Sequence, residues 1–381
     1  MELNGKQVIV AGHVTEVYGP VQALRNYLIK KTGELIYITH PFAYSKLEGS
    51  AAEFYVNGKV TNTVKGHKRG ANQFFQWLLD MIFNIKFVSG LKTKTNVFIA
   101  IDNLNALTAI VLKWFGKVDT VAYYIIDHTP RRFANPVFNW LYETIDGFAC
   151  KNSDYIWSLS QRIADAKNIK FKLKGSNNIV VPVGVELDKV DAFTVEEKIA
   201  KKTMILMSML DETKGVQLLI DSMQDIIKEV PSAELLIIGT GPYETKLKEQ
   251  AINLKLEKNV KFLGLMDHDT LFKFIPHHRI GLAPYINDAN NYSWYADPTK
   301  PKEYLGCGLP LVITDVPWIA EEVAKRPMGV VCKYERVSLV AACVKMLKDD
   351  DFYKICLKNS IDFASTLSWV VIYDKIFNEM K

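Results

Sequence analysis

The chain has 381 residues, 49% hydrophobic and 23% charged, a composition that excludes disordered and fibrous proteins and is sufficient for two domains. The net charge of +5 is uneven, with 23 Lys/Arg against 15 Asp/Glu before residue 191 and 24 against 27 from there on. A basic first half is typical of a surface that meets phospholipid head groups, nucleic acid or a phosphorylated acceptor, and equally of an uneven solvated surface.

The five cysteines are scattered and form no C-x-x-C pair, which argues against a zinc ribbon or a disulfide framework and indicates a reducing compartment. No His/Asp/Cys cluster has metal-ligand spacing, so no metal is expected. The start of the sequence lacks a basic segment followed by an apolar one, and no run of about 18 apolar residues occurs. We therefore expect a cytoplasmic protein.

Strands and helices alternate along the first half of the chain. Helical spacing marks Val21–Lys31 and Asn105–Phe115. The expected strands are short apolar runs: Val8–Ala11, Leu35–Thr39, Val97–Ile101, Val121–Ile126, Gly147–Cys150, Tyr155–Ser158 and Ile179–Val181. This alternation predicts a parallel sheet covered by helices on both faces.

The same alternation restarts after Val181–Val185, which we interpret as a hinge. The expected helices of the second half are Gly215–Glu229 and Tyr243–Leu254. Its expected strands are Thr203–Met207, Glu234–Ile238, Val260–Leu263, Ile280–Pro284 and Leu311–Thr314. The predicted fold class is α/β, with two Rossmann-like, doubly wound parallel-sheet domains facing across a cleft and ligands at the carboxyl ends of the strands.

Three short motifs follow expected strands in the second half. Lys214 lies at a helix start, where a cation beside free N–H groups suits a phosphate, although most such lysines are merely solvated. Gly239 and Gly241 follow a buried strand, where they permit close approach of a ligand or simply tight strand–helix packing. Gly264 ends a strand whose backbone could meet a nucleotide base or form an ordinary turn.

The stretch over residues 297–314 is the most specific in the sequence. Thr299 is expected to cap a helix that Lys300 and Pro301 open. Free N–H groups, the helix dipole and the charge of Lys300 favour a diphosphate there. Glu303 suits the vicinal hydroxyls of a ribose, with a capping-box partner as the alternative.

Pro298-x-Lys300-x-x-Glu303, followed by Gly308-x-Pro310, resembles the donor signature of the group-1, GT-B-fold glycosyltransferases, which are glycosyltransferase family 4-like. Further matches follow in the family's order and spacing over residues 179–316: Pro182–Glu186, Lys214–Gly215, Gly239–Pro242 and Asn259–Gly264. The resemblance implies a hexosyltransferase that takes its sugar from a nucleotide-diphosphate donor of UDP or GDP type, with no cofactor and no metal.

Carried over by position, the resemblance implies that Lys214 binds the donor diphosphate and Glu303 the ribose. Met209 stands where the family often has an Arg, and Tyr295 where its paired-glutamate motif has another Glu, so inversion or retention stays open. Some bacterial exopolysaccharide glucuronosyltransferases with inverting chemistry are similar in this stretch. The implied donor-binding residues are Lys214, Gly239, Gly241, Gly264, Pro298, Thr299, Lys300, Glu303 and, from the first half, Gly19.

The first half is less similar to the family. Its residues 12–20 take the place of the family's Gly-rich acceptor-side loop, with His13 toward the acceptor and Gly19 near the donor phosphate. An inverting transfer needs a general base to deprotonate the acceptor hydroxyl. The candidates for this base are, in order, Asp127, His128 and Glu16. Asp102 and Asn103 are candidates for binding acceptor hydroxyls, with helix capping as the alternative.

Residues 65–94 have basic flanks around an apolar helical pattern made by Phe74, Phe75, Leu78, Leu79, Ile82 and Phe83. A basic, aromatic amphipathic helix can lie in a membrane interface. The alternative is a core-facing helix beside a solvated basic loop. The membrane interpretation predicts a lipid-linked acceptor and peripheral contact with the inner face of the cell membrane.

These observations give a domain scheme and a function. Residues 1–182 are expected to bind the acceptor, 183–362 the donor, and 363–381, by the resemblance, to form a helix that crosses back to the first domain. The expected activity is sugar transfer to a saccharide or lipid-linked acceptor in bacterial cell-surface polysaccharide or glycolipid synthesis. Alternatives are a non-catalytic GT-B binding protein and a sugar-nucleotide epimerase or phosphorylase; no motif supports a nucleic-acid partner.

Overall fold

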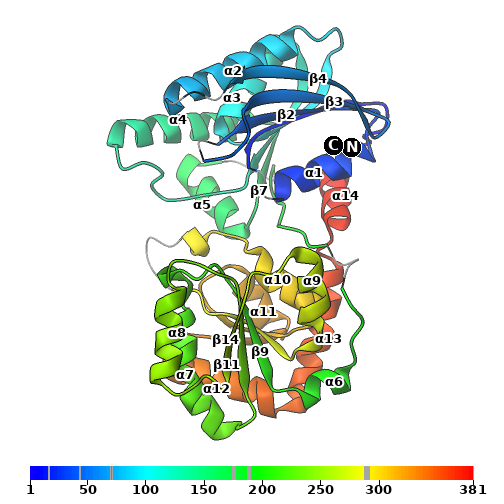
Figure 1. The fold of residues 1–381 in the computed structure, drawn as a ribbon. Coiled ribbons are helices and arrows are strands. Elements are labelled where there is room, and N and C mark those ends of the chain that lie inside the picture. The colour runs from blue at the N-terminus through cyan, green and yellow to red at the C-terminus, as the bar shows by residue number, and fades with distance from the viewer. Residues whose placement is uncertain are drawn as a thin grey trace. The chain divides into compact units, whose positions relative to one another are not determined.

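The computed structural model describes residues 1–15, 18–42, 44–68, 70, 72–173, 177–186, 190–286 and 292–380. The chain divides into two compact units (Figure 1). Unit 1 comprises Met1–Val183 together with Trp369–Lys381, and unit 2 comprises Gly184–Ser368. Each unit is built around its own sheet, with helices on both faces (Figure 1).

The sheet of unit 1 has eight strands in the order β4-β3-β2-β1-β5-β6-β7-β8. Neighbouring strands in the run β2-β1-β5-β6-β7-β8 pair in parallel, as predicted. The two remaining pairings, β2 with β3 and β3 with β4, are antiparallel. The strands are β1 (Gln7–Val14), β2 (Glu34–Pro41), β3 (Gly49–Val56), β4 (Lys59–Lys68), β5 (Thr95–Ile101), β6 (Val118–Ile125), β7 (Tyr155–Ser158) and β8 (Asn178–Val180).

The antiparallel pair β3–β4 was not predicted. Asn57 and Gly58 connect the two strands, both with positive φ, of 48° and 82°. An Asn-Gly turn of this kind is the strongest short-range sequence indication of a hairpin. It was missed because β4 is exposed along most of its length and therefore has no apolar pattern.

The helices of unit 1 are α1 (Pro20–Ile29), α2 (Gln73–Ser89), α3 (Asn103–Trp114), α4 (Pro136–Asn152), α5 (Gln161–Phe171) and α14 (Trp369–Glu379). The predicted strand Gly147–Cys150 is wrong, because these residues form the buried last turns of α4. Their apolar run reflects close helix packing: a Cβ on Gly147 would lie 2.8 Å from the ring of Phe171.

The C-terminal helix α14 packs on α1 at the start of the chain (Figure 1). The rings of Tyr27 and Phe377 stack with centroids 5.8 Å apart. Tyr27 donates a hydrogen bond of 2.6 Å to Asp374, and Tyr373 donates one of 3.0 Å to the carbonyl of Pro20. These contacts tie the end of the chain to unit 1.

The sheet of unit 2 has six strands, all parallel, in the order β11-β10-β9-β12-β13-β14. They are β9 (Thr203–Met207), β10 (Glu234–Ile238), β11 (Val260–Gly264), β12 (Ile280–Ala283), β13 (Leu311–Thr314) and β14 (Gly329–Cys332). Alternate residues of β9 join separate apolar clusters, Met204 and Leu206 in one, Ile205 and Met207 in the other. The sheet is therefore buried on both faces, and every strand predicted in this half is confirmed.

The helices of unit 2 cover that sheet. The α-helices are α6 (Val195–Ala200), α7 (Val216–Glu229), α8 (Glu244–Asn253), α9 (His268–Phe274), α10 (Thr299–Gly306), α11 (Ile319–Lys325), α12 (Arg336–Lys348) and α13 (Asp350–Ser365). Short 3₁₀ turns are η1 (Glu212–Lys214), η2 (Ile275–His277) and η3 (Tyr292–Trp294).

Each sheet has one point where the strand order reverses. In unit 1 the reversal lies between β1 and β5, and in unit 2 between β9 and β12. Doubly wound sheets bind ligands at the carboxyl ends of the strands at this point. The residues that follow these four strands are therefore the first place to look for a site.

Candidate functional site

His13 and Asp102 meet at the strand reversal of unit 1. His13 lies near the end of β1 and Asp102 directly after β5, and the Nδ1 of His13 is 2.8 Å from the Oδ2 of Asp102. Asp102 also caps α3, because its carboxylate accepts hydrogen bonds from the backbone N–H of Asn105 (2.9 Å) and from its side chain (2.7 Å). The sequence analysis proposed acceptor binding and capping as alternatives for Asp102, and the capping is observed.

Asp102 holds a strained backbone conformation. Its φ of 145° with ψ of 167° belongs to a region that only glycine adopts readily, at a cost of about 1–3 kcal/mol for other residues. The hydrogen bonds to His13 and Asn105 fix the carboxylate and so offset this cost. Such strain is characteristic of functional sites.

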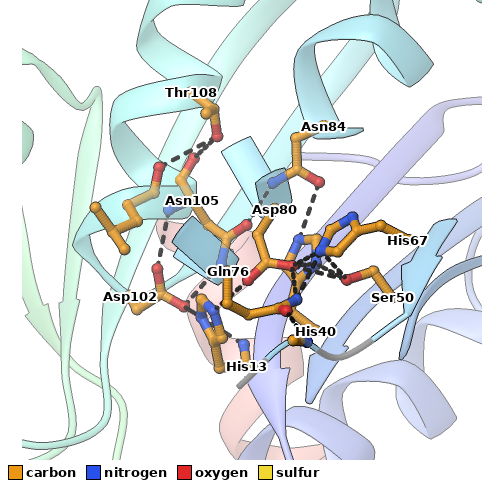
Figure 2. A network of polar contacts seen from close by, with 12 residues as sticks. His13, His40, Ser50, His67, Gln76, Asp80, Asn84, Asp102, Asn105 and Thr108 are labelled. Carbon is orange, nitrogen blue, oxygen red and sulfur yellow. Dashed lines mark hydrogen bonds and ion pairs between the residues drawn. The ribbon is translucent and has the colours of Figure 1, made fainter. Parts of the chain in front are cut away.

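Asp80, on α2, is the centre of a buried polar network behind this pair (Figure 2). It is 2% exposed and accepts a hydrogen bond of 2.7 Å from the hydroxyl of Ser50. Its carboxylate oxygens lie near three imidazoles, at 3.3 Å from His13, 3.0 Å from His40 and 2.9 Å from His67. The sequence analysis missed this cluster, although polar residues at Gln76, Asp80 and Asn84 repeat every four residues within an apolar helix.

The network makes His13 a cation. Burial lowers the pKa of His13, but the charges and hydrogen bonds of Asp102 and Asp80 outweigh it and raise the pKa to about 10. The pKa values of the Asp80 and Asp102 carboxyls lie below the usual range. Burial alone would raise them, but hydrogen bonds and charge, mainly from His13, outweigh the burial. Both ring nitrogens of His13 face carboxylates, so neither is left for an acceptor hydroxyl. His40 is neutral instead, because burial lowers its pKa despite its hydrogen bond to Asp80.

Raising the pH should therefore weaken the fold through His13. The pKa of a histidine is about 6.5 in an unfolded chain, so the stabilisation from His13 is complete below that pH and is lost as the pH rises toward about 10. Between pH 7 and pH 10, we expect the free energy of unfolding to fall by about 3 kcal/mol more in the wild type than in His13→Gln. Denaturant titrations at the two pH values measure the free energy of unfolding of both proteins.

The control is His277→Gln, which removes a half-exposed histidine paired with Glu197. Equal pH dependence in wild type and His13→Gln would contradict a charged His13.

Helix α2 buries its polar side and exposes its apolar side. Gln76, Asp80 and Asn84 are buried. Phe74, Phe75, Leu78, Leu79 and Ile82 are 37–61% exposed. The core-facing alternative for residues 65–94 is therefore wrong for these five side chains, because the interior of unit 1 needs the polar side of the helix to complete the histidine network. Residues 65–68, interpreted there as a loop, belong to β4.

A cavity of about 400 Å³ lies in unit 1, bounded by α2, α3, α4 and the ends of β5 and β6. Of its 22 lining residues, 16 are apolar or tyrosine. The polar ones are His13, Gln73, Asp102, Asn103, Asp127 and Arg132. The structure thus brings four residues named from the sequence, His13, Asp102, Asn103 and Asp127, to the wall of one cavity.

Asp127 follows β6 and forms an ion pair with Arg132 through its Oδ2. Its Oδ1 makes no hydrogen bond within the described part of the chain, and half of the side chain is exposed. Asp127 therefore has an oxygen available to an acceptor. Asn103, by contrast, is buried and donates its side-chain N–H to the carbonyl of Tyr142 at 3.3 Å.

The other residues named for this side lie elsewhere. His128 is buried and is not among the lining residues, and burial first, then the charge of Lys167, lowers its pKa to about 4, which makes it a poor base at neutral pH. Glu16 lies outside the described residues. Gly19 caps α1 and gives its backbone N–H to the side chain of Gln22 at 3.1 Å.

The start of α10 follows β12, at the strand reversal of unit 2. The helix begins at Thr299 and Pro298 is its N-cap, so the prediction of Thr299 as the cap is wrong by one residue. Pro298 has extended backbone angles (φ −70°, ψ 132°), whereas Thr299 is already helical. No side chain caps this end, and the N–H groups of Thr299 and Lys300 make no hydrogen bond with described residues.

A buried ion pair holds this helix start in place. The ammonium of Lys302 and the carboxylate of Asp297 contact each other, and both side chains are fully buried. Burial lowers the pKa of Lys302, against the opposing charge of Asp297. The sequence analysis missed this pair, because only the fold shows that these residues, five apart, face each other away from solvent.

Glu303 lies in the same helix with its side chain half-buried. The capping-box alternative is wrong, because the N-cap is Pro298, which has no N–H, and Glu303 is the fifth helical residue. Burial raises the pKa of Glu303, and the charges of Lys300 and His268 act in the opposite direction. The carboxylate makes no hydrogen bond or ion pair with a described residue, so its acceptor oxygens are open to a ligand.

Lys214 lies after β9, the strand next to β12. Its ammonium makes no hydrogen bond or ion pair with a described residue. Both strands end at the same edge of the sheet, so Lys214 and the open start of α10 share that edge. The arrangement offers one carboxylate, two lysines and two free N–H groups to a ligand with anionic and hydroxyl groups.

Comparisons with known proteins identify this second unit. Residues 190–363 match the family model described as "Glycosyl transferases group 1". Unit 2 is therefore similar to the group-1 glycosyltransferase domain over nearly its whole length. Over 99 residues the chain is 30% identical to the alpha-monoglucosyldiacylglycerol synthase of Streptococcus pneumoniae. This matched stretch covers 23% of this chain and 22% of that protein. Over 210 residues the chain is 24% identical to a GDP-mannose-dependent monoacylated alpha-(1-6)-phosphatidylinositol monomannoside mannosyltransferase of Corynebacterium glutamicum, 52% of this chain and 54% of that protein. The matches thus span between about a fifth and about a half of these relatives.

Solved structures show the fold of the whole chain. A complex of Anabaena Alr3699/HepE with UDP has a TM-score of 0.71 at 14% identity, and the match covers 98% of this chain and 99% of that one. Sucrose-phosphate synthase from Thermosynechococcus elongatus has a TM-score of 0.70 at 13% identity, with the same coverage. The group-1 glycosyltransferase domain is therefore part of a GT-B fold, as predicted.

The two glycines of the Gly-x-Gly motif have a packing role in unit 2. Gly239 has a φ of 133°, and a Cβ there would lie 1.8 Å from the carbonyl of Ser208. A Cβ on Gly241 would lie 2.3 Å from the carbonyl of Leu210. The N–H of Gly239 is also occupied, by the carbonyl of Gly264 at 2.8 Å. Gly264 differs, because a Cβ on it would meet open space.

Proposed function

We propose that the protein transfers a sugar from a nucleotide-diphosphate donor of UDP or GDP type to a saccharide or lipid-linked acceptor, in cell-surface polysaccharide or glycolipid synthesis. The observation that carries the proposal is Glu303, a half-buried carboxylate that has no partner among the described residues and lies beside an open helix start. A carboxylate accepts two hydroxyl hydrogen bonds, which suits the diol of a ribose. Names of relatives agree with the donor class, since one is GDP-mannose-dependent and one structure holds UDP.

The donor diphosphate would lie at the start of α10. The N–H groups of Thr299 and Lys300, the helix dipole and the ammonium of Lys300 all favour an anion there. Lys214 adds a second charge from the neighbouring strand. These groups stabilise the negative charge that grows on the leaving diphosphate as its bond to the sugar breaks, which lowers the barrier. Gly264, where an added Cβ would meet open space, leaves room for the base.

Asp127 is the proposed general base of the acceptor side for an inverting transfer. Its free Oδ1 would take the proton of the acceptor hydroxyl as that oxygen attacks the anomeric carbon. His13 is already charged, so it cannot take this proton, and it holds Asp102 in position instead. Asp102 and Asn103, on the same cavity wall, are proposed to bind acceptor hydroxyls.

Peripheral contact of this cytoplasmic protein with the inner face of the cell membrane is part of the proposal. Phe75, Leu79 and Ile82 form an exposed apolar face on α2, and Lys86 continues it one turn further on. Apolar side chains with flanking cations suit the headgroup region of an anionic bilayer. Within the described residues, no helix combines the length and the apolar character that crossing a bilayer requires.

A thermal-shift panel of UDP, GDP, ADP and CMP tests the proposal. A ligand that binds only the folded protein adds about 2.7 kcal/mol at 100 times its Kd, which raises the unfolding midpoint by several degrees. We expect UDP or GDP to do so, and transfer of sugar from the matching donor to follow. If no diphosphate raises the midpoint at millimolar concentration, the donor site is refuted and a non-catalytic binding protein becomes the better description. Release of free nucleotide with an epimerised sugar and no transfer would favour the epimerase.

A further inference from the structure

The cavity of unit 1 opens on the exposed apolar side of the unit. Phe74 and Leu78 of α2 line the cavity and are 49% and 47% exposed. Phe138 and Leu141 of α4 also line it and are 49% and 37% exposed. Because the same side chains face both the interior of the cavity and the solvent, they form its rim. The apolar lining is thus continuous with the apolar surface that we propose as the membrane contact.

An aromatic wall connects the two helices that carry this rim. The rings of Trp77 and Phe133 lie 6.0 Å apart, and those of Phe133 and Tyr142 lie 5.8 Å apart, both edge to face. These rings join α2, the loop after β6 and α4 into one side of the cavity. Edge-to-face aromatic pairs add stability beyond their burial, so this wall is a stable element of the fold.

The charged residues of the cavity come from the carboxyl ends of β1, β5 and β6 and from the loop after β6. They are two carboxylates, Asp102 and Asp127, and two cations, His13 and Arg132. Equal numbers of both signs favour a neutral head group with hydroxyls over an anionic one. The remaining lining is mostly hydrocarbon and aromatic ring, and a sugar in that part would lose hydrogen bonds to water without replacing them.

We propose that this cavity binds the hydrocarbon chain of a lipid acceptor, which enters from the membrane-facing rim and places a hydroxylated head group at Asp102 and Asp127. The inference rests on the proposed transferase function and names its acceptor class as a single-chain or prenyl amphiphile with a neutral head. The apolar surface that the hydrocarbon chain removes from water in this cavity favours binding in proportion to its area. A volume of about 400 Å³ lies within the usual range for small-molecule sites.

The test uses dodecyl glucoside with a photoreactive diazirine in its alkyl chain, below its micelle concentration. After irradiation of the full-length protein, mass spectrometry locates the cross-links. We expect labels on interior lining residues such as Trp77, Met81 and Tyr142. Ile145→Trp fills the cavity from α4 and should lower labelling about tenfold. Met81→Trp fills it from α2 and should do the same, which guards against a local packing defect in either variant.

Two controls separate the cavity from the outer surface. Phe75→Ser with Leu79→Ser and Ile82→Ser changes three exposed residues that do not line the cavity, and should abolish sedimentation with anionic phospholipid vesicles while keeping the interior labels. Ile252→Trp changes an exposed residue on α8 of unit 2 and should leave labelling unchanged.

Labels confined to the outer face of α2, or unchanged labelling in both filled variants whose unfolding midpoints remain near that of the wild type, would overturn the inference. Stabilisation by UDP or GDP is measured in the same samples. If it persists while the interior labels are absent, the lipid site is refuted and the transferase proposal stands. If interior labels are found without any nucleotide stabilisation, the transferase proposal fails and the cavity is a lipid site of another kind.

Discussion

Glu303→Gln should lower kcat/KM for the nucleotide-sugar donor by about two to three orders of magnitude. The carboxylate would accept two hydroxyl hydrogen bonds from the ribose, and hydrogen bonds to a charged group contribute about 1.5–3 kcal/mol each. Glutamine has the same shape but only one acceptor oxygen and no charge. The loss of one charged bond and the weakening of the other correspond to about 3–4 kcal/mol.

The measurements for Glu303→Gln are donor kinetics and the nucleotide thermal shift. The shift should disappear, whereas the midpoint without nucleotide should change little, because the carboxylate has no partner among the described residues. Glu257→Gln, an exposed residue in a loop of the same unit, is the matched control and should behave as wild type. Because burial raises the pKa of Glu303, nucleotide binding by the wild type should also weaken on acidification earlier than an ordinary carboxylate would cause. Unchanged nucleotide binding in Glu303→Gln would remove Glu303 from the donor site.

Asp127→Asn should lower kcat by about 10²–10⁴-fold, the usual contribution of a general base. The amide keeps the size of the side chain but cannot accept the proton of the acceptor hydroxyl. Nucleotide binding should be unchanged, because the residues proposed to hold the donor are in unit 2. A lowered kcat with an unchanged nucleotide shift therefore distinguishes a catalytic defect from a loss of the donor.

Asp119→Asn is the matched control for Asp127. Asp119 lies on β6, the strand that Asp127 follows, and its side chain is 43% exposed and pairs with Lys94. Its substitution therefore also removes an ion pair with a surface cation. Surface pairs contribute about 0–1 kcal/mol, so both variants should fold. Full activity in Asp127→Asn would contradict its role as the base and would favour a retaining transfer, which needs no protein base to deprotonate the acceptor in this position.

The sequence alone determined most of unit 2. β9, β10 and β13 begin and end at the predicted residues, because each is a short continuous apolar run buried on both faces of a parallel sheet. Such a run depends little on distant residues. The stretch around Pro298 and Lys300 also depends little on distant residues, because proline geometry and the following helix are local properties. The family resemblance of this stretch agrees with the family match of residues 190–363.

Only the tertiary structure decided the site of unit 1. His13, His40, His67, Asp80 and Asp102 come from five different elements or loops, and nothing in their local sequence indicates that they meet. Likewise, the pattern of α2 predicted an amphipathic helix but could not show which side faces inward. Three histidines and Ser50 around Asp80 compensate the burial of its carboxylate, and this long-range pairing turns the apolar side of α2 outward.

For Glu303, too, the sequence determined the position in a helix, and the tertiary structure decided the role. Its sequence position allowed a capping partner or a ligand contact, since both put a carboxylate near a helix start. The fold excluded the cap by placing Pro298 at the N-cap, and the buried pair of Lys302 with Asp297 fixes that start. Sequence patterns record which groups are close along the chain, but whether a polar group has a partner depends on residues that only folding brings together.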